Sequence, residues 1–388
     1  MAVVPAGVRA VIERRLARLR PLTRQVLRVA GVWGGEVDVP VLASIVEVGC
    51  DAVAGALDEA RAARLVSVGA GGRSAGLIHA LVGEVLVEEV STSQRRELHR
   101  RVARTIEAAG DPARVGEAAH HALAGASGDD IGWAVDLAAR AAGRAMAVLA
   151  YEEAAVWCER ALEVLRFEAP RDAAEAPLLM SFGEARLASG EVEAARAAFE
   201  RVAAIARRRG DGELLADAAL GFGLGFGAIE VQWLDPVQVE LLTEALDALG
   251  PEPSPRRVWV LARLSVALSF MDEEERRVAL AEEAEAMARV LDDRRALGYA
   301  LAARCDAWSG PDHCRERAED AAEVVATGLA SGDLRLEALG RRLRVVALWE
   351  LGEVAAADVE IAAFGRIAER LRQPRYQWYV PLWQGRGR

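Results

Sequence analysis

Residues 179–209, LMSFGEARLASGEVEAARAAFERVAAIARRR, set the fold class of this chain. The small residues Gly183 and Ala195 allow two helices to approach closely, and Phe199 is placed to fill the gap between them. Gly190 stands where the first helix must turn into the second. The segment therefore predicts two packed helices joined by a short turn.

From about residue 111 onward, the sequence predicts one helix after another. Short breaks rich in Gly, Asp or Pro fall near residues 125–130, 170–172, 210–212, 251–255, 292–293, 331–333 and 373–374. Their spacing is roughly 40 residues, and periods of that length are typical of solenoids. The pattern in 179–209 resembles the tetratricopeptide repeat, and parts of it recur at 151–162 and 347–356. We therefore predict an all-α protein in which residues 111–388 form a tetratricopeptide-like, right-handed α-solenoid whose last repeat is truncated.

The first 110 residues predict a different unit. Apolar residues at helical spacing predict helices over about 8–19, 22–33, 39–48 and 52–63, the last with Asp51 as its N-cap. A β-like run at 64–68, a glycine-rich turn at 69–74 and an apolar run at 75–78 then predict a small hairpin. Helices followed by a hairpin are the arrangement of a winged helix. We assign residues 1–110 to an N-terminal winged-helix domain with a β-hairpin wing.

The composition excludes several kinds of chemistry. The chain has no lysine, so its 48 Lys+Arg residues are all arginines. A P-loop requires a lysine that reaches the nucleotide phosphates, and Schiff-base catalysis requires a lysine amine. No Ser–His–Asp or Cys–His set can be assembled from five scattered histidines. We therefore expect no enzymatic activity and no cofactor.

Charge and hydropathy limit the cellular locations and the classes of binding partner that we expect for this chain. Residues 1–110 hold 15 Arg against 12 acidic residues, whereas residues 111–388 hold 33 Arg against 47, so the long acidic part would repel a nucleic-acid backbone. No stretch has the roughly 18 apolar residues needed to span a membrane, and the N-terminus lacks the apolar core of a signal peptide. With four scattered cysteines, the sequence predicts a cytoplasmic protein with no membrane contact.

Four N-terminal stretches resemble a known family: VPAGVR (4–9), IERRLARL (12–19), IHALV (78–82) and ELHRRVA (97–103). Together they resemble the region that follows the nucleotide-binding domain of bacterial STAND ATPases, signalling regulators that include LuxR-type transcription factors. Members of that family typically run NTPase, winged helix and tetratricopeptide-like repeats. The resemblance covers about residues 4–383 and implies a protein in which the repeats receive a signal and the winged helix relays it.

The chain departs from that family at both ends. It begins where the winged helix should begin, and it ends within what reads as the opening helix of another repeat. We therefore expect a fragment, a degenerate gene product or a standalone remnant without ATPase activity of its own. The resemblance implies a protein or peptide partner in the groove of the repeats, and a nucleotide-binding domain that docks on the winged helix.

His79 is the one candidate site residue. In the family's relatives, a histidine just after the winged-helix hairpin lies in a Met-His-Asp-like motif and senses the phosphates of the bound nucleotide. Here the triplet is Ile78-His79-Ala80, which lacks the acidic member. The resemblance implies that His79 is a vestigial nucleotide-phosphate sensor, and the alternative is a histidine that makes a structural hydrogen bond at a helix start.

Three other patterns favour structural explanations. Cys305, Asp306, Asp312, His313 and Cys314 resemble a metal cluster, but adjacent residues point to different faces of a helix, so packing is the better interpretation. The same geometry argues against a metal site at His120-His121. The glycine-rich residues 221–227 follow no β-strand, so a dinucleotide loop is not predicted.

DNA binding through the winged helix is the second functional hypothesis. This hypothesis rests on the arginines of the winged helix, which are Arg61, Arg64, Arg73, Arg95, Arg96, Arg100, Arg101 and Arg104. A recognition helix needs basic residues that face the groove, yet the helix expected at 39–48 has no arginine. We therefore rank a regulatory, protein-binding scaffold first, and DNA is not the expected partner. The third hypothesis is an ATP-dependent switch whose NTPase belongs to another chain.

Overall fold

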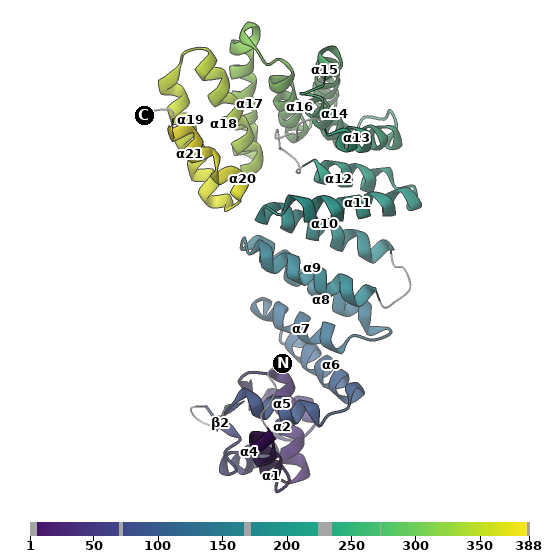
Figure 1. Cartoon of the computed structure of the whole chain (residues 1–388), viewed down its shortest axis with the longest axis vertical. Coiled ribbons are helices and arrows are strands. Elements are labelled where there is room, and N and C mark those ends of the chain that lie inside the picture. The colour runs from purple at the N-terminus through teal and green to yellow at the C-terminus, as the bar shows by residue number, and fades with distance from the viewer. Residues whose placement is uncertain (1–5, 70–72, 167–171, 224–234, 272, 386–388) are drawn as a thin grey trace. The chain divides into compact units, whose positions relative to one another are not determined.

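The computed structural model describes residues 6–69, 73–166, 172–223, 235–271 and 273–385. It divides into two compact units (Figure 1). The first unit comprises Met1–Ala141 with Glu163–Pro170, and the second comprises Ala142–Leu162 with Arg171–Arg388. Each unit has its own core, described separately below.

The first unit combines helices with a three-stranded sheet. Its elements are α1 (Ala6–Leu16), α2 (Pro21–Trp33), β1 (Val37–Asp38), α3 (Val39–Val46), α4 (Cys50–Ala62), β2 (Val66–Val68), β3 (Ser74–Leu77), α5 (Ala80–Glu88), α6 (Thr92–Ala108), η2 (Pro112–Arg114), α7 (Val115–Gly125) and the larger part of α8 (Asp130–Ala147). Helix α2 contacts α3, α4, α5 and α6, so it forms the centre of the unit. The α2–α5 contact is close because Gly31 and Gly83 face each other.

The sheet has the order β1-β3-β2, and both pairs are antiparallel. Strands β2 and β3 form the predicted hairpin, with Val66 opposite Leu77. Strand β1 was not predicted, because a strand of two residues is too short to show an alternating pattern. The proposed cap at Asp51 was wrong. Helix α4 begins at Cys50 with Gly49 as its N-cap, and Asp51 lies in the first turn, where its charge still favours the helix N-terminus.

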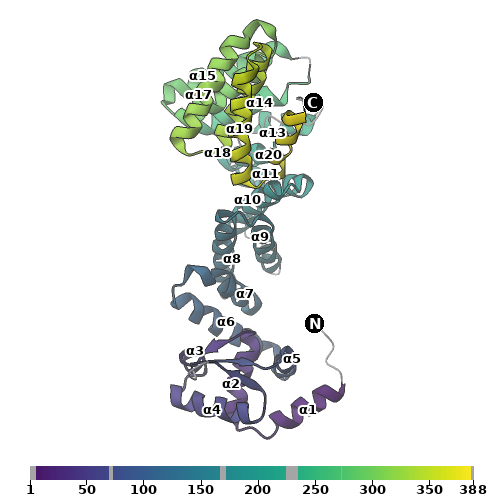
Figure 2. The same ribbon diagram turned by 90° about the vertical axis from the view of Figure 1, so that its left-hand side faces the viewer.

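The second unit is an array of helices. Besides the end of α8 and most of α9 (Tyr151–Leu165), it contains α10 (Asp172–Ser189), α11 (Val192–Arg209), α12 (Gly212–Phe222), α13 (Pro236–Leu249), α14 (Pro255–Ala267), α15 (Glu274–Leu291), α16 (Arg294–Ala307), η3 (Pro311–His313), α17 (Cys314–Ser331), α18 (Leu334–Glu350), α19 (Val354–Leu371), α20 (Pro374–Gln377) and α21 (Tyr379–Gln384). From α10 to α19, each helix packs on the next (Figure 2). The predicted stack of helix pairs is confirmed, while its right-handed sense stays a prediction.

Recurring caps explain the period of the array. Helices α12, α16 and α18 begin at Asp211, Asp293 and Asp333, whose side chains accept hydrogen bonds from backbone N–H groups of the first turn. The residue before each of these caps has a positive φ, as at Gly210 (63°) and Gly332 (68°). A left-handed residue ends one helix and the following aspartate starts the next. The breaks seen in the sequence at residues 210–212, 292–293 and 331–333 are therefore turns between successive helix pairs.

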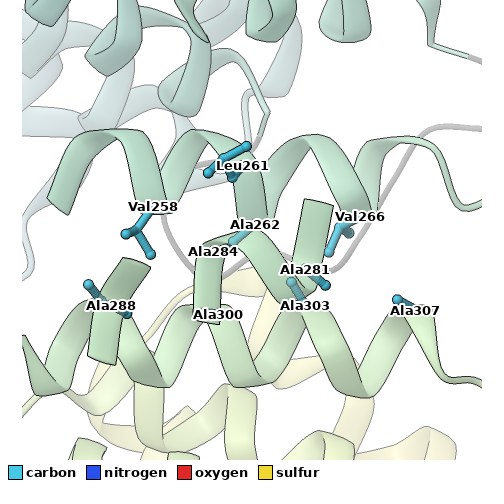
Figure 3. Close-up of a cluster of buried hydrophobic side chains, with 11 residues drawn as sticks. Val258, Leu261, Ala262, Val266, Ala281, Ala284, Ala288, Ala300, Ala303 and Ala307 are labelled. Carbon is cyan, nitrogen blue, oxygen red and sulfur yellow. The ribbon is translucent and has the colours of Figure 1, made fainter. Parts of the chain in front are cut away.

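Small side chains set the spacing between helices in the core. In the cluster of Figure 3, Ala281, Ala284 and Ala288 of α15 pack against Ala300 and Ala303 of α16. Alanine side chains let helix axes approach closely while still excluding water. The sequence is rich in alanine on these faces because the array is built from close helix contacts.

Phe199 has the role that the sequence predicts. Its side chain is 0% exposed, and a Cβ built on Gly183 would lie 2.6 Å from its ring. A Cβ on Gly221 of α12 would lie 2.5 Å from the same ring. Phe199 therefore joins three helices rather than the two that the sequence indicated.

Among the described residues, no single helix is long and apolar enough to cross a membrane. Helices α3 and α4 reach the required length and apolar composition only when they are taken together, and the chain bends by 107° between them.

Candidate functional site

The even-numbered helices of the second unit form one layer. Helices α10, α12, α14, α16 and α18 each contact the next member of this series, besides their odd-numbered neighbours. Side chains from α10, α12, α18 and α20 meet around one small cavity of about 30 Å³. Helices far apart along the array therefore face a common space. We call the surface of the even-numbered helices that borders this cavity the inner face.

A charged cluster lines that cavity. It consists of Glu184, Asp217, Arg335 and Arg375. Desolvation by the surrounding protein raises the pKa of Glu184, the Asp217 carboxylate raises it further, and Arg335 opposes the rise. The side chain is nevertheless exposed to solvent.

Aromatic and arginine side chains also meet between α14 and α16. The Cζ atom of Arg295 lies 5.7 Å from the ring centre of Trp259 and 5.9 Å from that of Tyr299. Its Nε donates to Asp333 at 3.0 Å. Burial raises the pKa of Tyr299, which is 6% exposed and whose hydroxyl donates to Asp333 at 3.5 Å. Arg, Trp and Tyr are the residue types that most often anchor protein interfaces.

The last helices close the array onto its beginning. The Tyr151 hydroxyl of α9 donates to the Leu371 carbonyl at 2.7 Å, and Gln373 Nε2 donates to the same hydroxyl at 3.3 Å. Tyr151 is 5% and Gln373 1% exposed. A Cβ on Gly190 would lie 3.4 Å from Pro374. The two hydrogen bonds of Tyr151 join residues 220 and 222 positions apart, and no pattern in the sequence predicted them.

A separate cavity of about 690 Å³ lies in the first unit. Its walls come from the end of α2, the hairpin and α5. Six glycines line it, so much of its surface is backbone, and Val68, Leu77 and Val87 supply apolar contacts. Cavities of this size are typical of small-molecule sites.

His79 lies at the start of α5 and is exposed. Its Nδ1 accepts a hydrogen bond from the Leu81 backbone N–H at 3.2 Å, so the imidazole caps the helix. This contact is the structural hydrogen bond at a helix start that the alternative interpretation of His79 predicts. The nucleotide-sensing role remains a prediction from the resemblance.

Four of the eight arginines on which the DNA-binding hypothesis rests form ion pairs, namely Arg61, Arg100, Arg101 and Arg104. Arg61 pairs with Asp58, Arg101 with Glu47, and Arg104 with Asp130. Helix α4 carries Arg61 as its one arginine, and α3 carries none. The hairpin turn at residues 70–72, beside Arg73, lies outside the described residues.

Packing accounts for the other sequence motifs, as far as they lie within the described residues. Cys305 Sγ donates to the Arg317 carbonyl at 3.5 Å, and Cys314 Sγ lies 3.3 Å from a Glu350 carboxylate oxygen. Burial raises the pKa of Cys305 to about 12, so it stays a thiol. Among the described residues, no group of three or more His, Cys, Asp or Glu is arranged to hold a metal ion. Of the glycine-rich run, residues 224–227 lie outside the described part.

Three histidines gather between α6 and α7, which the sequence analysis did not anticipate. The Nδ1 atoms of His99 and His121 are 2.8 Å apart, so one donates to the other, and the ring of His120 lies 5.1 Å from that of His121. Burial lowers the pKa of His99 to about 4 and that of His121 to about 3; the neighbouring histidines and the cations Arg95 and Arg114 add to it. His99 and His121 are 22 residues apart, and only the packing of two helices joins them.

The buried pair His99 and His121 predicts that the free energy of unfolding decreases at acidic pH. Both rings are neutral in the folded state, whereas an unfolded histidine has a pKa of about 6.5 and binds a proton below it. Stability is therefore fully present above about pH 6.5 and declines as pH falls toward 3. After allowance for partial solvent exposure, we expect a loss of about 2 kcal/mol between pH 7 and 4.5, measured by urea unfolding.

The variant H99Q/H121Q should flatten this pH dependence. The matched control is H313Q, because His313 is exposed. An equally steep loss in the double variant would show that other groups cause the acid sensitivity.

No protein-family model and no curated protein matches the chain. Among solved structures, a STAND protein with a tetratricopeptide repeat sensor from Pyrococcus horikoshii is 12% identical with a TM-score of 0.40, covering 99% of this chain and 63% of its own. The apo form of RapI is 12% identical (TM-score 0.43; 66% of this chain, 99% of its own). A Rap protein complexed with competence and sporulation factor is 9% identical (TM-score 0.45; 78% and 88%). This chain thus spans less than two thirds of the STAND protein, and these similarities are too distant to assign it to a family.

Proposed function

We propose that this chain is a regulatory scaffold whose helical array binds a protein or peptide segment on its inner face. The observation that carries the proposal is the cluster of Glu184, Asp217, Arg335 and Arg375, which brings charged side chains from α10, α12, α18 and α20 around one cavity. Such a surface recognises a partner by shape, charge and apolar contact. In this proposal the chain acts by binding and catalyses no reaction.

Arg335 and Arg375 define the class of partner. Guanidinium groups bind carboxylates with two parallel hydrogen bonds, and aromatic rings accept apolar side chains. We therefore propose a peptide segment that carries acidic and apolar residues. The contacts between Tyr151 and Leu371 would hold the array in a shape that fits this segment.

The first unit would relay the binding event. Its order of helix, strand, two helices and hairpin, with the sheet order β1-β3-β2, supports the winged-helix interpretation. We propose that this part, in about residues 1–110, docks on a nucleotide-binding domain, as the resemblance to STAND regulators implies. DNA is not the proposed partner, because α3 and α4 offer little positive charge.

Selection from a phage-displayed peptide library on the purified chain tests the proposal. We expect enrichment of acidic peptides with apolar residues, and fluorescence anisotropy should show binding about tenfold or more weaker to R335E. The control is R366E on α19, where Arg366 is exposed on an odd-numbered helix; it should change the affinity less than about twofold. Failure to enrich any peptide, or equal binding to R335E and wild type, would contradict the proposal.

A further inference from the structure

The cavity of the first unit contains an excess of negative charge. Three carboxylates, those of Glu36, Glu84 and Glu88, line it together with the guanidinium of Arg95. Two of the carboxylates already have partners. Glu36 accepts a hydrogen bond from Ser74 Oγ at 2.5 Å, and Glu88 pairs with Arg9 at 2.5 Å.

Glu84 differs from the other two. Its Oε2 atom is buried and has no hydrogen-bond partner. A buried, unpaired carboxylate oxygen destabilises a protein, because it has lost water and gained no donor in return. Glu84 stands on α5 beside Gly83, whose close contact with Gly31 fixes this wall of the cavity. The half-buried carboxylate of Glu84 therefore lines the cavity while one of its oxygens lacks a hydrogen-bond donor.

We propose that this cavity binds a small primary amine with an apolar body. The ammonium group donates to Glu84, and the apolar body lies against Val68, Leu77 and Val87. A charge-assisted hydrogen bond from an ammonium group to a carboxylate is roughly twice as strong as a bond between neutral groups. Phosphates and other anions are disfavoured, because carboxylates outnumber guanidinium groups on the walls. The site is independent of the inner face, which belongs to the other unit.

Two matched probes test the amine preference. Phenethylamine and phenethyl alcohol have the same apolar body and differ in the charged group. Titrations followed by saturation-transfer NMR on the full chain should show the amine bound about tenfold or more tightly than the alcohol. In E84Q this preference should disappear.

Two further variants complete the experiment. E13Q makes the same change in net charge at an exposed carboxylate on α1, outside the cavity, and should retain the amine preference. V87W fills the cavity and should abolish binding of both probes, which keeps the test valid even if E84Q folds poorly. Equal affinity for amine and alcohol, retained preference in E84Q, loss of preference in E13Q, or undiminished binding by V87W would each overturn the proposal.

Discussion

Replacement of Phe199 with alanine should lower the free energy of unfolding of the second unit by about 3–5 kcal/mol. The ring is fully buried and lies between Gly183 of α10 and Gly221 of α12. Because neither glycine has a side chain that could move into the space, truncation leaves a cavity at the contact of three helices. Urea unfolding followed by far-UV circular dichroism measures the loss, and hydrogen exchange should show it in α10, α11 and α12.

Two other variants separate this cavity from a general effect of losing apolar surface. L329A removes an exposed side chain from α17 (58% exposed) and should cost less than about 0.5 kcal/mol. G183A should itself destabilise the array, because the new Cβ would lie 2.6 Å from the Phe199 ring. Combined with F199L, it should cost less than the sum of the two single changes. Additive losses would mean that the close contact of glycine and ring is not present.

Replacement of Arg304 with methionine should also cost about 3–5 kcal/mol. Arg304 donates to Asp320 through Nε at 2.8 Å and through a second nitrogen at 2.5 Å, and it also contacts Glu285. The side chains of Asp320 and Glu285 are 10% and 13% exposed. Without Arg304, two carboxylates from α15 and α17 lie close together and largely desolvated. The loss is measured by urea unfolding.

Two controls distinguish this buried network from an ordinary ion pair. R61M breaks an exposed pair with Asp58 and should cost less than about 1 kcal/mol. The triple variant R304M/E285M/D320M replaces the buried part of the network by apolar side chains and should regain most of the stability lost in R304M. The remaining member, Arg289, pairs with Glu285 in the wild type and is 53% exposed, so water can solvate its charge. A small effect of R304M, or a triple variant as unstable as R304M, would show that the network contributes little.

The helical part of the fold could be predicted because its signals are local. Gly183, Gly190 and Phe199 lie within one pair of helices, and the turns carry glycine and aspartate at the capping positions. The hairpin was also local, with its turn between two short apolar runs. Strand β1 and the contact of Phe199 with Gly221 could not be predicted, because each depends on a partner in another segment.

The candidate sites were mostly hidden from the sequence for the same reason. Glu184 and Arg335 lie on α10 and α18, and nothing in either helix marks them as neighbours. His99 was not predicted to join this group, because only His120 and His121 are adjacent in the sequence. Glu84 looks like an ordinary polar residue of α5 until the hairpin and α2 surround it.

The sequence by itself determined that most of this chain is a series of helix pairs, that a hairpin lies near its N-terminus, and that the chain has no lysine for chemistry that requires one. These properties follow from periodicity, capping residues and composition, which act over a few residues. Only the tertiary structure decided which side chains share a surface. The inner face, the contact between Tyr151 and Leu371, the buried histidine pair and the unpaired oxygen of Glu84 all arise when distant segments pack together. Packing brings such groups together and removes their water, and a linear pattern records neither effect.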